Sequence, residues 1–453
     1  MVRLFTVMTA KDSRLRSDTL QISNEASKVL GLQEGDKVTL FAGKLFTQLK
    51  VNINPNKSDL NIEFNPTVLR QLHLSDSYKY GINSINDSFH IGPVIGIMAS
   101  HTNDKNRPFG SQSHFFSELI NYGRVLGEIC FVFSPVSINF QNKTILGYTN
   151  VNGFWKKGVF PIPDVIYSRN AGDGSRLKIR SKLEALGCKF INPPHIGSKW
   201  QTHKYLSHDL SLSKYLPDTR VITNFQQVKQ MLDEYGVVYL KPINGSKGRN
   251  IIKVIKNKNT RLYEYHYQLN YQPHQGTANN LNTLQQSLKK IMGNRSYIVQ
   301  RGINLLKVDG NIADVRVLVQ KDHTGQPLIT GKAFRIGKKS SITSNISGGG
   351  TGERLQVVLK RCFPDILVRE KILQDINCLA LKVTQVLEEN TSAIGELGID
   401  IGIDIKGKVW FIEANPKPAR RVFNLIGEMS TRKMSIQRPL LYAYFLAGFS
   451  QER

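Results

Sequence analysis

Asp400, Glu413 and Asn415 carry the side chains in this sequence whose types and spacing are best suited to chemistry. They lie in residues 397–418, where apolar residues surround them and a Lys-Gly pair at 406–407 marks a turn. This pattern is typical of a β-hairpin. An exposed hairpin that holds two acidic residues is the alternative, and the number of apolar neighbours argues against it.

The register of this hairpin relates the two acids to each other. With a two-residue turn at 406–407, Ile405 pairs with Lys408. Counting outward from that pair places Asp400 directly opposite Glu413, with Cβ atoms about 4.5 to 5.5 Å apart.

Facing carboxylates repel each other unless a cation lies between them, so the register predicts a metal site. Asn415 lies on the same strand face as Glu413, and the three side chains together form an all-oxygen set of the kind that Mg²⁺ prefers. Asp404 lies on the face of Asp400 but nearer the turn, and it is a weaker candidate ligand.

Residues 238–254 form a candidate phosphate site. A strand ends at Lys241, a glycine-rich basic turn begins at Gly245, and a second strand returns. Glycines let backbone N–H groups approach phosphate oxygens, Ser246 adds a hydroxyl, and Lys247 adds charge. The segment lacks the spacing of a Walker loop and a strand follows it, so an ordinary hairpin turn is the alternative.

Arg316 and Arg335 are predicted to lie on two successive strands, at 313–320 and 329–336. An arginine buried on a sheet face usually pairs with a carboxylate or a phosphate. Asp314 shares the face of Arg316 and is its candidate partner. A purely structural ion pair is the alternative to a catalytic role.

The composition indicates a basic multidomain protein. The chain has 453 residues, and 61 Lys and Arg against 35 Asp and Glu give a net charge of +26 and a pI near 9.8. This charge favours anionic partners, although a solvated basic surface explains it equally well. The basic residues are scattered and no nucleic-acid-binding motif accompanies them, so we do not expect nucleic acid as a partner.

We expect a cytoplasmic protein without a transmembrane segment. No apolar run approaches the roughly 20 residues needed to cross a bilayer, and the first residues lack a secretory signal. The four cysteines show no Cys-x-x-Cys spacing and are expected to be reduced thiols.

The chain is predicted to fold as a β-rich module at 1–90, a small parallel α/β domain at 91–195 and an α+β domain at 196–453. In the first module, a strand, a short helix and a turn are expected at 20–23, 26–32 and 34–38. The parallel sheet is expected from strands and helices at 94–98, 115–126, 129–133, 165–167, 176–186 and 189–192. The polar stretch 268–282 is expected to be a loop.

Taken in order, these segments resemble the ATP-grasp superfamily, whose two α+β subdomains hold ATP between antiparallel sheets. The resemblance implies that Lys199 and Lys241 contact the nucleotide phosphates and that Asp400, Glu413 and Asn415 bind magnesium. It also implies a phosphate-covering loop and a hinge strand that contacts adenine, whose matching residues here are Gly245, Ser246, Lys247, Gly248, Asn250, Gln300 and Gly302. The family normally has a glutamate near the position of Gln300.

Other residues are similar to the pattern of glutathione synthetase and of RimK-like ligases. The resemblance implies that Arg316 and Arg335 stabilise transition-state charge and an acyl phosphate. It also implies a substrate-binding set formed by Asn345, Gly348 and Gly349, with Arg169 from the preceding domain as a candidate for a substrate carboxylate. The residues between Arg335 and Asn345 differ from the sequence motif that is usual in these ligases.

The whole chain resembles the YheC/YheD family of bacterial endospore-coat-associated ATP-grasp proteins, through residues 92–97, 161–169 and 408–415. The resemblance implies a sporulating source, a link to the spore coat and contacts with coat proteins. We expect an Mg-ATP-dependent carboxylate–amine ligase whose substrate is an amino acid, a peptide or an acidic polymer. The alternatives are a coat scaffold that binds ATP without turnover, and a basic protein that binds polyanions.

Overall fold

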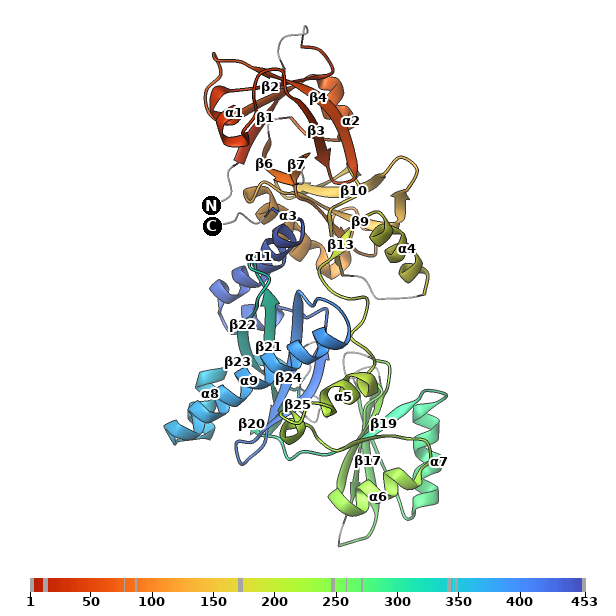
Figure 1. The fold of residues 1–453 in the computed structure, drawn as a ribbon. Helices are drawn as coiled ribbons and strands as arrows, with labels where there is room; N and C mark the ends of the chain where they lie inside the picture. Colours follow the sequence, from red (N-terminus) through yellow and green to blue (C-terminus); the bar gives the residue numbers. More distant parts are fainter. Residues whose placement is uncertain are drawn as a thin grey trace. The chain divides into compact units, whose positions relative to one another are not determined.

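A computed structural model gives the fold, and the chain divides into two compact units. The structure describes residues 4–10, 15–76, 78–85, 88–169, 174–245, 249–257, 259–269, 272–339, 344, 346 and 349–449. Unit 1 contains Met1–Pro194, Lys321–Gln326 and Ile436–Arg453, and unit 2 contains His195–Gln320 and Pro327–Ser435 (Figure 1).

Unit 1 begins with a closed barrel of strand order β1-β5-β2-β4-β3-β7-β6. The strands are β1 (Leu4–Thr9), β2 (Thr19–Ile22), β3 (Lys37–Ala42), β4 (Leu45–Ile53), β5 (Asn61–Phe64), β6 (Tyr78–Ile85) and β7 (Ser88–Gly92), with helices α1 (Asn24–Leu30) and α2 (Pro66–Gln71). Ser23 caps α1 by accepting the N–H of Ala26 at 3.0 Å, and Gly31 ends the helix with φ of 68°. The expected strand at 20–23, short helix at 26–32 and turn at 34–38 correspond to β2, α1 and the turn before β3.

A second sheet of unit 1 has the order β11-β10-β9-β8-β12-β13. It contains β8 (Val94–Met98), β9 (Ile129–Asn139), β10 (Thr144–Val151), β11 (Phe154–Pro161), β12 (Val165–Ser168) and β13 (Lys189–Phe190), with η1 (Gly110–Gln112), α3 (Ser113–Val125) and α4 (Gly174–Ala185). The four strands expected from apolar runs are parallel, as predicted.

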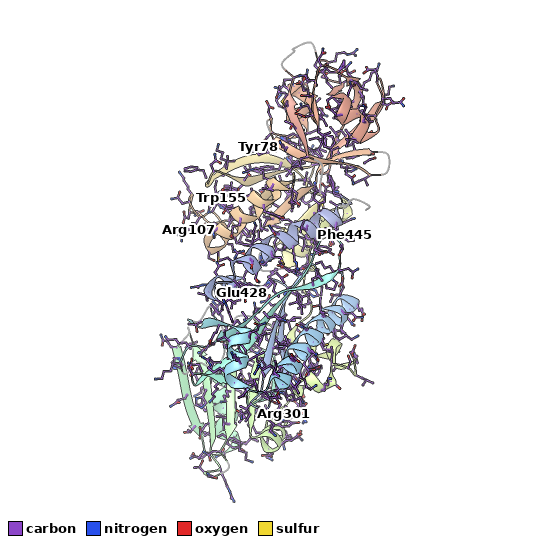
Figure 2. The ribbon with its side chains drawn as sticks, turned by 90° about the vertical axis from the view of Figure 1, so that its left-hand side faces the viewer. Tyr78, Arg107, Trp155, Arg301, Glu428 and Phe445 are labelled. Carbon is purple, nitrogen blue, oxygen red and sulfur yellow. The ribbon has the colours of Figure 1, made fainter. Side chains whose placement is uncertain are left out.

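The antiparallel hairpin of β10 and β11 is a feature that the sequence did not indicate. Exposed Lys156 and Lys157 interrupt its apolar alternation, because β11 is an edge strand. In the same strand, Trp155 (Figure 2) lies with its ring centroid 5.3 Å from that of Phe109. The last turns of α11 (Met429–Leu446) also pack in unit 1, through Ile436 and Leu440.

In unit 2, the first sheet has the order β14-β19-β15-β16-β17-β18 and is called the β15 sheet below. It contains β14 (Thr219–Val221), β15 (Val237–Pro242), β16 (Ile252–Lys256), β17 (Tyr263–Leu269), β18 (Gln272–Ala278) and β19 (Tyr297–Arg301). Helices α6 (Gln226–Tyr235) and α7 (Leu281–Met292) pack on one face of it, and α5 (Lys199–Ser207) and η2 (Ser213–Tyr215) precede it (Figure 1).

The expectation that residues 268–282 form a loop is wrong. This stretch contains the end of β17, the strand β18 and the start of α7. Tyr265 and Tyr267 pack against the core on one face, while polar residues occupy the other. Gly276 leaves space for the ring of Tyr265, because a Cβ at 276 would lie 2.3 Å from its hydroxyl. The polar composition of an edge strand therefore concealed its alternation.

The second sheet of unit 2 has the order β23-β22-β21-β24-β25 and is called the β24 sheet below. It contains β21 (Asn311–Lys321), β22 (Pro327–Ile336), β23 (Thr351–Arg354), β24 (Glu396–Ile403) and β25 (Val409–Asn415), and β20 (Lys307–Val308) pairs with β21. Helices α8 (Leu355–Cys362) and α9 (Ile366–Asn390) cover one face, and α10 (Arg421–Leu425) packs near Leu318 on the other.

Side-chain alternation on β21 decides which residues face away from α9. Val315 and Val317 lie in the core beneath α9, so Asp314 and Arg316 point to the opposite face. No helix among the residues that the structure describes is long and apolar enough to span a membrane.

Candidate functional site

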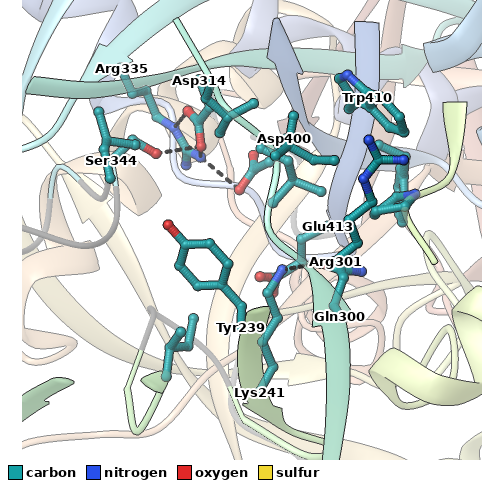
Figure 3. Close-up of a pocket in the computed structure, with 17 residues that line it drawn as sticks. Tyr239, Lys241, Gln300, Arg301, Asp314, Arg335, Ser344, Asp400, Trp410 and Glu413 are labelled. Carbon is teal, nitrogen blue, oxygen red and sulfur yellow. Dashed lines mark hydrogen bonds and ion pairs between the residues drawn. The ribbon is translucent and has the colours of Figure 1, made fainter. Parts of the chain in front are cut away.

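A pocket lies in unit 2 between the β15 sheet and the β24 sheet (Figure 3). Its lining includes the apolar residues Ile303, Leu305 and Phe411, and its ionisable lining residues are Tyr239, Lys241, Arg301, Asp314, Arg335, Asp400 and Glu413. The pocket therefore combines an apolar wall with charges of both signs.

Asp400 lies directly opposite Glu413 across β24 and β25, as the sequence predicts. The turn differs from the expectation. Asp404, rather than Ile405, pairs with Lys408, and its N–H donates to the Lys408 carbonyl at 2.9 Å. By itself, this one-residue change of the turn would place Asp400 opposite Ile412 rather than Glu413.

A β-bulge restores the alignment of the two acids. Ile401 pairs with Phe411, and the next pair is Asp400 with Glu413, so Ile412 is left as the extra residue. The side chain of Ile412 lines the pocket beside Glu413. The predicted pairing of Asp400 with Glu413 is confirmed, and the predicted pairing of Ile405 with Lys408 is wrong.

Two arginines hold Asp400. Arg316 Nε donates to Asp400 Oδ1 at 2.6 Å, and an Nη2 of Arg335 lies 2.7 Å from Asp400 Oδ2. Burial alone would raise the pKa of Asp400, but the two guanidinium groups outweigh it and the pKa is lowered. Asp400 is therefore ionised at neutral pH.

Asp314 pairs with Arg335, which corrects the expectation that its partner is Arg316. Arg335 Nε and Nη2 donate to the two oxygens of Asp314 at 2.7 and 2.5 Å. Ser344 also donates its hydroxyl to Asp314. Burial would lower the pKa of Arg335, but Asp314 and Asp400 raise it. Arg316 instead faces its cross-strand neighbour Asp400, since β21 and β24 pair in that register.

Among the described residues, little positive charge lies close to the carboxylate of Glu413. Its nearest cation among the described residues is Lys199, whose Nζ lies 3.9 Å from Oε1. Burial raises the pKa of Glu413, and Asp400 contributes in the same direction. A divalent cation between Asp400 and Glu413 would offset this cost.

The donor set fits magnesium better than a softer metal. Within the described ranges, no group of three His, Cys, Asp or Glu residues gathers in one place. Asn415 supplies an amide oxygen two residues beyond Glu413 on the same strand, and this oxygen accepts the N–H of Lys417 at 2.9 Å. Two carboxylates and an amide oxygen suit a hard cation.

Lys199 and Lys241 approach the same acids from the β15 side. Lys199 is the first residue of α5, which Ser198 caps by accepting the N–H of Gln201 at 3.2 Å. Its Nζ donates to the carbonyl of Gly245 at 2.6 Å. Burial lowers the pKa of Lys241 to about 8. The two lysines thus place positive charge near the pocket.

Gln300 holds Lys241 in position. Its Oε1 accepts from Lys241 Nζ at 2.6 Å, and its Nε2 donates to Thr219 Oγ1 at 2.9 Å. Gly302 follows, and a Cβ there would lie 2.8 Å from the carbonyl of Val237, so backbone packing requires glycine. Both the oxygen and the nitrogen of the Gln300 side-chain amide therefore form hydrogen bonds within the protein.

The loop that is predicted to cover the phosphates is described only at its ends. Gly245 accepts from Lys199, and Asn250 has φ of 58° and accepts the hydroxyl of Tyr297 at its carbonyl, at 3.0 Å. Ser246, Lys247 and Gly248 lie outside the described residues.

Of the predicted substrate residues, the structure describes Gly349 and Arg169. Asn345 and Gly348 lie outside the described residues, and Gly349 has φ of 95°, which favours glycine. Arg169 belongs to unit 1, where its guanidinium lies 5.5 Å from the ring centroids of Phe115 and Tyr167. Its role in substrate binding stays a prediction.

Trp410 and Arg301 are pocket residues that the sequence analysis did not select. The guanidinium of Arg301 lies 5.5 Å from the Trp410 ring centroid, and Lys408 Nζ lies 3.9 Å from it. Asp404 accepts the indole N–H of Trp410 at 3.0 Å and the N–H groups of Lys406 and Lys408. Asp404 is thus part of the turn. Trp410, Phe411 and Ile412 form a continuous apolar run. This run did not mark Trp410 as a site residue, because any buried apolar strand shows the same pattern.

Two antiparallel sheets that enclose lysines from one side and paired carboxylates from the other define an ATP-grasp protein. A family model described as "YheC/D like ATP-grasp" matches residues 187–446, and the chain belongs to this family.

Two relatives and one solved structure illustrate the similarity. The chain is 29% identical over 374 residues to the endospore coat-associated protein YheD of Bacillus subtilis (strain 168), covering 79% of this chain and 80% of that protein. It is 26% identical over 320 residues to YheC of the same organism, covering 68% of this chain and 86% of that protein. The structure of D-cycloserine synthetase DcsG aligns with a TM-score of 0.47 and 9% identity, covering 79% of this chain and 100% of that chain.

Proposed function

We propose that the protein is an Mg-ATP-dependent ligase that joins a carboxylate to an amine through an acyl phosphate, in association with the bacterial spore coat. The observation that carries the proposal is the register pair of Asp400 and Glu413, which line the same pocket as Lys241. The spore-coat association rests on the names of the relatives YheD and YheC.

The basic residues bind and neutralise the triphosphate. Lys199 and Lys241 reach the pocket from α5 and β15, and Gln300 fixes the direction of the Lys241 side chain. Gln300 and Arg301 of β19 line the pocket together with Trp410, against whose ring a base would lie. Most of the catalysis then comes from positioning and from fixed charges.

Asp400, Glu413 and Asn415 would hold the magnesium ion, which when bound supplies charge stabilisation to the phosphate oxygens. Arg335 is fixed by two hydrogen bonds to Asp314, and its Nη2 also lies 2.7 Å from Asp400 Oδ2. Arg316 approaches the same carboxylate from β21. In the proposed reaction, both guanidinium groups stabilise negative charge on the transferring phosphoryl group.

The proposed reaction balances in two steps. The carboxylate oxygen of the substrate attacks the γ-phosphorus, ADP leaves, and an acyl phosphate remains. The amine nitrogen then attacks the carbonyl carbon, loses a proton, and inorganic phosphate leaves. The substrate is an amino acid, a peptide or an acidic polymer, and the net charge of +26 favours the acidic polymer.

Acceptor screening tests the proposal. Wild-type protein is incubated with Mg-ATP and with pools of amino acids, peptides or polyglutamate, and released phosphate is measured. At least one pool should raise phosphate release, with ADP rather than AMP as the other product. The Asp400→Asn/Glu413→Gln variant should show none of this release.

Binding of ATP without turnover is the second candidate function. The observation in its favour is that Asp400 already has a guanidinium on each of its oxygens. Tight Mg-ATP binding without phosphate release from any pool would support this scaffold role and contradict the ligase.

A further inference from the structure

Both oxygens of Asp400 are occupied within the protein. Arg316 Nε donates to Oδ1 at 2.6 Å, and Arg335 lies 2.7 Å from Oδ2. Asp400 is only 7% exposed, so water does not compete effectively for it. Figure 3 shows Arg335 bridging Asp314 and Asp400 at the upper side of the pocket. A metal ion cannot use Asp400 fully until at least one of these arginines moves.

The two arginines are held to different degrees. Arg335 makes two hydrogen bonds to Asp314 in addition to its contact with Asp400. For Arg316, the described part of the chain shows one ion pair, with Asp400. Gly398 lies beneath its guanidinium, where a Cβ would come within 3.4 Å of Nη1. Arg316 is therefore the arginine that can leave Asp400 at lower cost.

The charges around the site oppose a free cation. Four basic side chains, Lys199, Lys241, Arg316 and Arg335, surround three acidic ones, Asp314, Asp400 and Glu413. A divalent cation that enters alone adds to the positive excess. A triphosphate reverses it and offers the guanidinium of Arg316 new oxygen acceptors.

We propose that Arg316 is a gate on the metal site: it holds Asp400 until nucleotide phosphates draw its guanidinium away, so that the divalent metal binds only together with the nucleotide. This inference rests on the proposed function, because it assumes that the pocket binds a nucleotide and that Asp400 is a metal ligand. It assigns Arg316 a role before chemistry begins, as a positioning residue that acts through Asp400.

Binding of Mn²⁺, measured from the loss of its free electron paramagnetic resonance signal, tests the gate without any turnover. In the absence of nucleotide, Arg316→Met should bind Mn²⁺ at least about 10-fold more tightly than wild type, within the usual size of coupling between ligands. Arg316→Lys, which keeps the charge, should bind as weakly as wild type. Arg361→Met is the control, since it removes the same charge from an exposed pair with Glu353.

A second measurement uses only the wild-type protein, so it tests the gate even if Arg316→Met does not fold. With ¹⁵N-labelled arginine, the Nε–H signal of Arg316 should shift when Mg-ATP is added and stay in place when Mg²⁺ is added alone. A shift with Mg²⁺ alone, or wild-type Mn²⁺ affinity equal to that of Arg316→Met, would overturn the gate. Failure of wild type to bind Mn²⁺ even with ATP would overturn the proposed function instead.

Discussion

The ammonium group of Lys241 lies 2.6 Å from the side-chain oxygen of Gln300. The partner is a neutral amide, the described residues show no ion pair to Lys241, and burial lowers the pKa of Lys241 to about 8. The carboxylate of Glu413 acts on Lys241 through a longer-range electrostatic interaction, which raises the pKa of Lys241. This relationship makes the charge of the pocket sensitive to pH near neutrality.

Nucleotide affinity is expected to fall as the pH rises through 8. The protonated lysine binds phosphate, and with a pKa of about 8 its charged fraction drops by about 10-fold between pH 7 and pH 9. Gln300→Glu places a carboxylate beside Lys241, raises its pKa and should preserve affinity at pH 9. Calorimetric titration with ATP at both pH values checks this. An unchanged pH profile in Gln300→Glu would contradict the assignment to Lys241.

Glu413→Gln is expected to stabilise the ligand-free protein while removing its function. Burial raises the pKa of Glu413, so the folded state opposes its ionisation, and this cost appears as the pH rises above the ordinary value of 4.5. Removing the charge should gain roughly 0.5–2 kcal/mol at pH 7. Thermal unfolding without ligand measures this gain, and Glu353→Gln, at a partly exposed position, is a control that should change little. A lower unfolding temperature in Glu413→Gln would refute this.

Glu128 in unit 1 predicts a local pH dependence. Neither carboxylate oxygen has a hydrogen-bond partner in the part of the chain that is described, and burial raises the pKa of Glu128 well above its usual value. Stability from the neutral carboxyl is present at low pH and is lost as the pH rises toward the raised pKa. Hydrogen exchange in α3 and β9 should therefore speed up between pH 5 and pH 8, after correction for intrinsic exchange.

The control for that prediction is Glu128→Met. This substitution removes the titrating group and keeps a long apolar chain beside Gly123, where a Cβ would lie 2.8 Å from Glu128 Oε2. Protection of α3 and β9 should then be independent of pH. The same pH dependence in Glu128→Met and wild type would assign the effect to another group.

Gly398→Ala is expected to disturb the metal-binding strand. A Cβ at 398 would lie 2.7 Å from Pro418 Cβ and 3.4 Å from Arg316 Nη1, so the segment after Asn415 must shift. Overpacking of this kind costs about 1–3 kcal/mol. Chemical denaturation and Mg-ATP titration should both show a loss. Gly158→Ala, whose Cβ would meet only the ring of Phe160 at 3.3 Å, should cost less in denaturation and leave Mg-ATP affinity unchanged.

The sequence predicted the acid pair better than it predicted the turn beside it. Period-two alternation placed Asp400 and Glu413 on one face, and the apolar residues around them identified buried strands. The bulge at Ile412 has no sequence signature, because isoleucine suits either a paired or an extra position. Two deviations of one residue cancelled, and the pairing of the acids was recovered.

Partners across the sheet were harder to predict. Asp314 and Arg316 share a face of β21, but pairing with β22 and β24 gives each a nearer partner on another strand. Sequence order does not show which strands are neighbours, so the choice between Arg335 and Arg316 depended on the sheet order. The same limit concealed Trp410 and Arg301, which meet only after β19 and β25 fold onto one pocket.

Calorimetric titration of Mg-ATP tests the central claim most directly. Wild type should bind ATP in a manner that requires Mg²⁺, and Asp400→Asn/Glu413→Gln should lose that binding. The control Glu370→Gln/Glu389→Gln removes two carboxylates from exposed positions of α9 and should bind like wild type. Absence of binding in wild type, or equal Mg²⁺-dependent binding in the Asp400→Asn/Glu413→Gln variant, would contradict the account.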